Sequence, residues 1–151
     1  MVDSVKPDIV VGTESWLRPD IMNSEIFPSN YTVYCCDRDT SGGGVFIAVI
    51  DEILSTRQQH LETSCEMAWA KISVVACKDL YVFSYYRPKA DDKDSLELLF
   101  SSLDRTFNSK NCHIWLAGDV NFHGINWLSK TLKQLSFFRL ARIICKMSGC
   151  L

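Results

Sequence analysis

The sequence lacks several patterns that would assign it to familiar classes of protein. No apolar run approaches the roughly 20 residues that a membrane-spanning helix requires. No two of the seven cysteines form a CxxC pair, and their odd number and irregular spacing argue against a zinc knuckle or a disulfide framework. With 7 glycines and 4 prolines, the chain is neither collagen-like nor composed like a disordered tail. We therefore expect reduced, mostly buried thiols in an intracellular protein.

The first residues also lack a basic segment followed by a long apolar stretch, so no secretory signal is expected. What is present is the composition of one globular domain, with 151 residues that are 47% hydrophobic and 23% charged. All 18 acidic residues lie within the first 127, beside 11 basic ones, whereas residues 128–151 hold five basic residues and no acidic one. The first 127 residues would not bind nucleic acid by charge alone, so a phosphate ligand would need local help such as a metal ion.

Short β-type runs separated by turn residues dominate the first hundred positions. They predict strands at 9–12, 31–36, 45–50, 67–75 and 80–86, with a further strand at 113–117. The runs at 31–36 and 45–50 flank a glycine-rich turn, which indicates a hairpin. Strand, crossover helix and strand over residues 80–117 are typical of a mixed α/β layer. The basic residues of segment 128–151 are interpreted as one face of a helix.

The crossover helix has the clearest signals in the chain. Asp94 is placed to cap it, with Glu97 three positions later completing a capping box. Apolar residues then recur at helical spacing, which predicts one apolar stripe facing a sheet: Leu96, Leu99, Phe100, Leu103 and Phe107.

Oxygen-bearing side chains follow the first and the last of these strands. Glu14 comes just after the first strand, and Asp119 and Asn121 come just after the last. Because ligands of α/β sheets gather at the carboxyl ends of strands, these three residues could form an oxygen-lined site suited to Mg²⁺. The alternative is a plain turn at Asp119 and a solvated strand end at Glu14.

Three further residues could contact a phosphate. Tyr86 ends the strand at 80–86 and Arg87 follows it, where a phenol can donate a hydrogen bond and a guanidinium can pair with phosphate oxygens. The alternative is that the aromatic pair Tyr85 and Tyr86 packs at a sheet edge before Pro88. Arg38 precedes the glycines at 42–44 and could touch a DNA backbone, or it could be an ordinary solvated arginine.

The order of these pieces resembles a known family. The segments PDIVVGTESWL, EIFPSNYTVYCCDRDTSGGGVFIAV, YYRP, SLELLFSSLDRTF and IWLAGDVNFHGINW together resemble the endonuclease domain of non-LTR (LINE-type) retrotransposons. That domain belongs to the exonuclease–endonuclease–phosphatase superfamily. The resemblance implies a four-layer α/β/β/α sandwich, Mg²⁺-dependent cleavage of DNA phosphodiesters and a nuclear location.

The resemblance also implies roles for single residues. Glu14 matches the metal-binding glutamate of the family, and Tyr86 matches the tyrosine that contacts the scissile phosphate. Asp119 matches the residue that positions or deprotonates the attacking water, and Asn121 the one that holds the phosphate and the transition state. Arg38 and Arg87 are the additional substrate-binding candidates.

Two departures from the family lead us to expect a truncated domain. The family begins with a strand that ends in a metal-site asparagine, which would precede Met1, and it ends in a Ser-Asp-His triplet that has no counterpart after Trp127. We expect a partial domain over residues 1–127, a divergent basic tail over 128–151, and an activity that is lost. The alternatives are a catalytically silent module that binds DNA or protein, and a phosphatase of small phosphoesters. No membrane partner is indicated, and the oligomeric state is left open.

Overall fold

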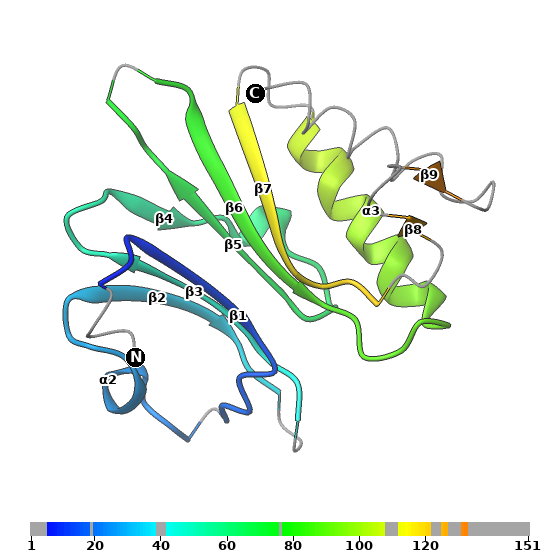
Figure 1. Ribbon diagram of the computed structural model, residues 1–151, viewed down its shortest axis with the longest axis horizontal. Helices are drawn as coiled ribbons and strands as arrows, with labels where there is room; N and C mark the ends of the chain where they lie inside the picture. Colours follow the sequence, from blue (N-terminus) through cyan, green and yellow to red (C-terminus); the bar gives the residue numbers. More distant parts are fainter. Residues whose placement is uncertain are drawn as a thin grey trace.

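The computed structural model describes residues 6–18, 20–38, 42–75, 77–107, 112–121, 125–126 and 131–132. Two β-sheets pack face to face, and a long helix covers the outer face of one of them (Figure 1). The described part of the chain therefore has three layers, sheet on sheet on helix, which are three of the four layers of the sandwich expected from the sequence. No helix among these residues is long and apolar enough to cross a membrane.

The first sheet has three antiparallel strands in the order β1 (Ile9–Thr13), β3 (Val45–Ile50) and β2 (Tyr31–Cys36). Strands β2 and β3 are adjacent and antiparallel, which confirms the expected hairpin. A single turn of helix, α2 (Asn23–Ile26), lies between β1 and β2 and was not expected. Thr13 pairs with Val45, so β1 ends beside the start of β3.

The second sheet has the order β4 (Ser55–Arg57), β5 (Met67–Ile72), β6 (Asp79–Tyr86) and β7 (Cys112–Asp119). Strands β6 and β7 are parallel and are joined through helix α3 (Lys93–Phe107), which confirms the predicted crossover unit. The short 3₁₀ turn η1 (Gln59–Leu61) connects β4 to β5.

Strand β5 ends earlier than the sequence suggested. It stops at Ile72, because the amide of Cys77 donates to the carbonyl of Val74 across 3.2 Å and closes a turn. Val75 lies in that turn and is 93% exposed, so a β-branched residue here does not extend the strand.

Alternation along β5 and β6 builds two separate cores. One set of side chains meets α3, and its largest buried members are Trp69, Phe83, Tyr85, Leu99 and Leu103. The opposite set meets the first sheet, and its buried members include Ile47, Val49, Ala70, Ile72 and Val82. Burying both faces explains why these central strands are nearly continuous apolar runs.

The helix cap differs from the one expected. Asp92, and not Asp94, caps α3: its carboxylate accepts the amide of Ser95 at 3.0 Å and the hydroxyl of Ser95 at 2.7 Å. These bonds hold the pKa of Asp92 below its usual range. The expected apolar stripe is confirmed at its centre, where Leu99 and Leu103 are fully buried.

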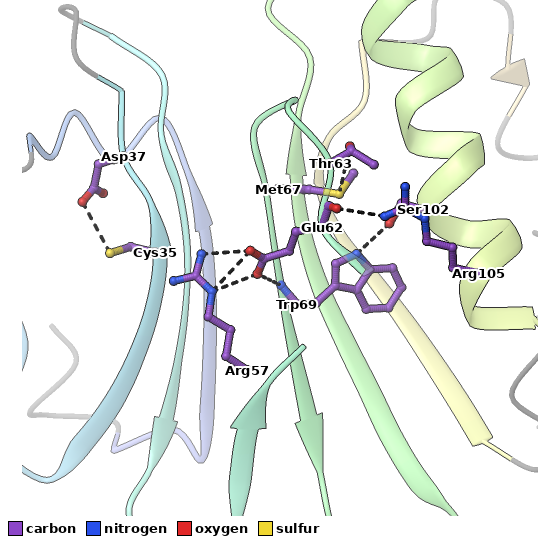
Figure 2. Close-up of polar contacts among 9 residues, drawn as sticks. All are labelled: Cys35, Asp37, Arg57, Glu62, Thr63, Met67, Trp69, Ser102 and Arg105. Atoms are coloured by element: carbon purple, nitrogen blue, oxygen red, sulfur yellow. Dashed lines mark hydrogen bonds and ion pairs between the residues drawn. The ribbon is translucent and has the colours of Figure 1, made fainter. Parts of the chain in front are cut away.

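The connection between β4 and β5 is fastened to both neighbouring layers (Figure 2). Arg57 donates two hydrogen bonds of 3.0 Å to the carboxylate of Glu62, which also accepts the amide of Trp69 at 3.2 Å. From α3, Arg105 donates to the carbonyl of Glu62 at 3.1 Å, and the Ser102 hydroxyl donates to the carbonyl of Leu61 at 2.6 Å. The connection is thereby tied to β5 on one side and to α3 on the other.

The described cysteines are more exposed than the sequence predicts. Of the described cysteines only Cys65 is buried, so the prediction of mostly buried thiols is wrong. Cys35 and Cys36 are half-buried because they lie on β2, an outer strand of its sheet, and Cys77 is exposed in a turn.

Of the tail 128–151, the structure describes only β9 (Thr131–Leu132), which pairs with β8 (Ile125–Asn126) and is not helical at those two residues. The remainder of the expected helix lies outside the described residues.

Candidate active site

Three strands end at the same edge of the molecule. Strands β1, β6 and β7 run in a common direction and finish close together (Figure 1). The amide of Arg87, just beyond β6, donates to the carbonyl of Asp119 at the end of β7, at 2.9 Å. Between the sheets, the hydroxyl of Ser84 on β6 donates to the carbonyl of Gly12 on β1, at 3.0 Å. We call the carboxyl ends of these three strands, with the residues directly after them, the strand-end edge.

The close approach of the parallel strands β6 and β7 at this edge depends on one glycine. Gly118 has a φ of 130°, and a Cβ built there would overlap the carbonyl of Tyr85 on β6. Only glycine fits such a close approach of two backbones. Asp119, the last residue of β7, is therefore held at a point where the two backbones pack tightly.

Glu14 is held by the glycine segment before β3. Its carboxylate accepts the amide of Gly43 at 2.9 Å, while the amide of Trp16 donates back to the carbonyl of Gly43 at 3.0 Å. Glu14 and Trp16 both have positive φ values, so the chain turns sharply as it leaves β1. Gly43 and Gly44 also have positive φ, which glycine adopts without strain. The Glu14 carboxylate is therefore oriented and remains exposed to solvent.

Glu66 lies beside the strand-end edge, and the sequence did not single it out for function. It lies just before β5, and its carboxylate accepts the amide of Gly44 at 2.6 Å and forms an ion pair with Arg38. Its carbonyl accepts the amide of Tyr86 at 3.0 Å.

Asp119 and Asn121 bind each other. The Asp119 carboxylate accepts the main-chain amide of Asn121 at 3.0 Å, and the Asn121 side-chain nitrogen lies 3.4 Å from its second oxygen. That nitrogen also donates to the carbonyl of Arg87 at 2.7 Å. Asn121 has a φ of 48°, a conformation that asparagine tolerates better than most residues. The pair is thus a closed turn anchored on the end of β6.

Tyr86 and Arg87 are largely inside the protein. Tyr86 is 9% exposed and packs in the core between the two sheets. Arg87 is 2% exposed, and its guanidinium donates to the carbonyls of Ala90 and Asn121. One guanidinium nitrogen of Arg87 thus joins two loops through their main-chain carbonyls, which favours a structural contact over an exposed phosphate ligand. The guanidinium of Arg38 likewise has a protein partner, because it forms an ion pair with Glu66.

Tyr85 precedes Tyr86 on β6, and its side chain lies on the opposite face of the sheet. Tyr85 is fully buried against α3, and its hydroxyl donates to the carbonyl of Ser95 at 3.0 Å. Burial raises the pKa of Tyr85 well above the ordinary value for a phenol. Tyr85 therefore serves the helix-facing core, and Tyr86 is the tyrosine at the strand-end edge.

The donor set fits a water-rich cation and not a protein cage. No group of three or more His, Cys, Asp or Glu side chains that could hold a metal occurs within the described segments. Mg²⁺ keeps several waters and needs one or two carboxylates, so the exposed, oriented carboxylate of Glu14 suits it.

Comparison with known proteins supports this fold. No model of a protein family matches the chain, and no curated protein is significantly similar to it. Among solved structures, the endonuclease domain of TRAS1, a telomere-specific non-LTR retrotransposon, superposes with a TM-score of 0.56 at 16% sequence identity. The match covers 98% of this chain and 60% of that domain, so the chain spans about three-fifths of the TRAS1 domain's length.

A second solved structure is a variant of the 3′ phosphatase NExo from Neisseria, bound to a product DNA hairpin. It matches with a TM-score of 0.48 and 15% identity, over 83% of this chain and 51% of that one. The sandwich fold expected from the sequence is confirmed by the TRAS1 likeness: the chain shares the two-sheet α/β sandwich fold of that retrotransposon endonuclease domain.

Proposed function

We propose that this chain is an endonuclease-type domain whose strand-end edge binds a DNA phosphodiester together with Mg²⁺. The supporting observation is that β1, β6 and β7 end together, which collects an oriented carboxylate, a tyrosine and an Asp–Asn pair along one edge. The fold shared with the TRAS1 endonuclease domain makes DNA the expected ligand class. Because the first 127 residues are acidic overall, a cation between protein and phosphate is needed to offset like-charge repulsion.

Each residue has a distinct part in this proposal. Glu14 holds the cation, and Asp119 and Asn121 contact the phosphate. Tyr86, which is largely buried and pairs with Asp119 in the register of β6 and β7, supports that end of the edge. When bound, Mg²⁺ supplies positive charge beside the phosphodiester oxygens. The chain's own contribution is orientation, because Gly43 fixes Glu14 and the turn at the end of β7 fixes Asp119 and Asn121.

We further propose that this chain hydrolyses DNA weakly or not at all. The Asp119 carboxylate accepts the main-chain amide of Asn121, which lowers its availability as a general base. Losing one such group lowers a rate by about 10²–10⁴-fold. Binding without efficient cleavage is therefore the expected behaviour.

Binding is tested by fluorescence anisotropy of a labelled DNA duplex, with Mg²⁺ and with EDTA. We expect Mg²⁺ to tighten binding by roughly tenfold, equivalent to about 1.4 kcal/mol. Glu14→Gln should remove this gain. Glu52→Gln is the matched control, because it removes the same charge from an exposed residue beyond the opposite end of β3. Equal Mg²⁺ dependence in both variants would refute the proposed cation site.

Cleavage is tested by the nicking of supercoiled plasmid. We expect no nicking above background in the presence of Mg²⁺. Nicking that Asp119→Ala abolishes would show that the chain is an active endonuclease, and the proposal of weak activity would then be wrong.

A further inference from the structure

We infer that Glu66, paired with Arg38, is a positioning residue for Glu14 and sets the cation affinity of the strand-end edge. This inference rests on the proposed function of that edge. Glu66 does not face the cation in this assignment. It acts through the two glycine amides that lie between its carboxylate and that of Glu14.

The two carboxylates bind consecutive peptide groups. The amide of Gly43 donates to Glu14 at 2.9 Å, and the amide of Gly44 donates to Glu66 at 2.6 Å. The Gly44 amide shares one rigid peptide plane with the Gly43 carbonyl, which accepts the amide of Trp16 at 3.0 Å. Fixing this plane at the Gly43 Cα limits the directions open to the Gly43 amide. Glu66 thereby helps to set where the Glu14 carboxylate lies.

The glycine segment is shaped around Glu66. Gly43 and Gly44 have φ values of 78° and 85°, so this stretch needs an external partner to select one of the many conformations that glycine allows. A Cβ at Gly43 would lie 2.5 Å from a Glu66 carboxylate oxygen and 3.0 Å from the Arg38 guanidinium. The segment therefore closes directly over the ion pair.

Charge explains why Arg38 belongs to this arrangement. Two carboxylates bound to neighbouring amides repel each other, and a second free acid beside Glu14 would raise the local negative charge that a DNA ligand meets. The Glu66 side chain is only 15% exposed, and its ion pair with Arg38 offsets its charge. Glu14 then remains the one carboxylate of this pair that is open to a cation.

The main chain of Glu66 links the same segment to the second sheet. Its carbonyl accepts the amide of Tyr86 at 3.0 Å, next to the register pair of Met67 and Tyr85. One residue thus holds the Glu14 segment of the first sheet through its side chain and the Tyr86 end of the second sheet through its backbone. This placement couples the two halves of the candidate site.

Mn²⁺ affinity, measured by electron paramagnetic resonance of the free ion, tests the inference. We expect Glu66→Gln to weaken Mn²⁺ binding by about tenfold, since groups that orient a metal ligand typically contribute 10–100-fold. Glu62→Gln is the matched control, because Glu62 also pairs with an arginine, also accepts a main-chain amide, and is 14% exposed. Its Mn²⁺ affinity should stay within about twofold of that of the unmodified chain.

An amide NMR spectrum separates this inference from the proposed function. Glu66→Gln should shift the Gly43 and Gly44 amide resonances without metal, and Glu14→Gln should also shift that of Gly43, whereas Glu62→Gln should shift neither. If the unmodified chain binds no Mn²⁺ but these shifts appear, the cation site fails and the positioning role stands. Unmoved Gly43 resonances in Glu66→Gln, or equal Mn²⁺ affinities in Glu66→Gln and Glu62→Gln, would overturn the inference. If Glu66→Gln does not fold, Arg38→Gln replaces it and should shift the Gly44 amide resonance, because it frees the Glu66 carboxylate that accepts this amide.

Discussion

The indole N–H of Trp69 donates to the hydroxyl of Ser102 across 2.9 Å, in a part of the core from which water is excluded (Figure 2). The same hydroxyl donates to the carbonyl of Leu61 at 2.6 Å. One serine on α3 thus satisfies a strand side chain and a turn carbonyl together. This contact fixes the helix on the sheet whose strands β6 and β7 carry the candidate site.

Ser102→Ala is expected to lower the free energy of unfolding by about 1–3 kcal/mol, because it leaves the Trp69 indole and the Leu61 carbonyl buried without this partner. Urea denaturation should show a lower midpoint with an unchanged slope. Ser101→Ala is the control, since Ser101 is exposed and bonds only to its own helix. Equal midpoints for the two variants would show that the buried contact contributes nothing.

Gly118→Ala is expected to destabilise the protein by about 2–5 kcal/mol, because its φ of 130° and its overlap with the Tyr85 carbonyl combine backbone strain with overpacking. Gly42→Ala should cost about 1 kcal/mol, since Gly42 also has a positive φ but has open space around it. Thermal unfolding of both variants checks the difference. A Gly118→Ala protein as stable as Gly42→Ala would contradict the close approach of β6 and β7.

Asp92→Ala should lower the free energy of unfolding by about 1 kcal/mol at neutral pH, which is the typical contribution of a helix N-cap. The pKa of Asp92 is depressed in the folded protein, so its ionised form contributes stability above the ordinary carboxyl pKa, and that contribution is lost as the pH falls through the depressed value. The difference between Asp92→Ala and the unmodified chain should therefore shrink on acidification. Asp94→Ala should have the smaller effect at pH 7. A larger effect for Asp94→Ala would restore the cap predicted from the sequence.

Tyr85→Phe tests the buried phenol. Burial raises the pKa of Tyr85, so the folded state resists its ionisation, and stability falls as the pH rises above the ordinary phenol pKa. At neutral pH the variant should lose about 1 kcal/mol with the bond to the Ser95 carbonyl. At alkaline pH its stability should decline less steeply than that of the unmodified chain. Parallel alkaline curves measured by denaturant unfolding would show that Tyr85 is not the responsible group.

Much of the strand framework could be read from the sequence, because buried strands are long apolar runs bounded by turn residues. The run Tyr31–Cys36 and the run Val45–Ile50 coincide with the observed strands β2 and β3. The helix cap was harder, because Asp91, Asp92 and Asp94 all precede the apolar stripe, and only the contact with Ser95 distinguishes them. The short elements α2 and β4 carry too few residues to show any periodicity.

The candidate site was predictable in its strand ends but not in its connections. Glu14 and Asp119 follow recognisable strands, so their place at an edge could be expected. The role of Glu66 depends on contact between two sheets with 22 residues separating it from Gly44, and no local pattern reveals such a contact. Arg87 shows the same limit, because its burial depends on how two loops close over its guanidinium.

The parallel pairing of β6 with β7 has a consequence for synthesis on the ribosome. Asp119 reaches Tyr86 only after the whole of α3 has been made and laid back across the sheet. A nascent chain that has emerged only as far as Phe107 can form the hairpin of β2 and β3 and the pairing of β5 with β6, yet it holds no acidic group from β7. The proposed DNA-binding edge is therefore assembled late, once translation has passed β7, the last described strand of the second sheet.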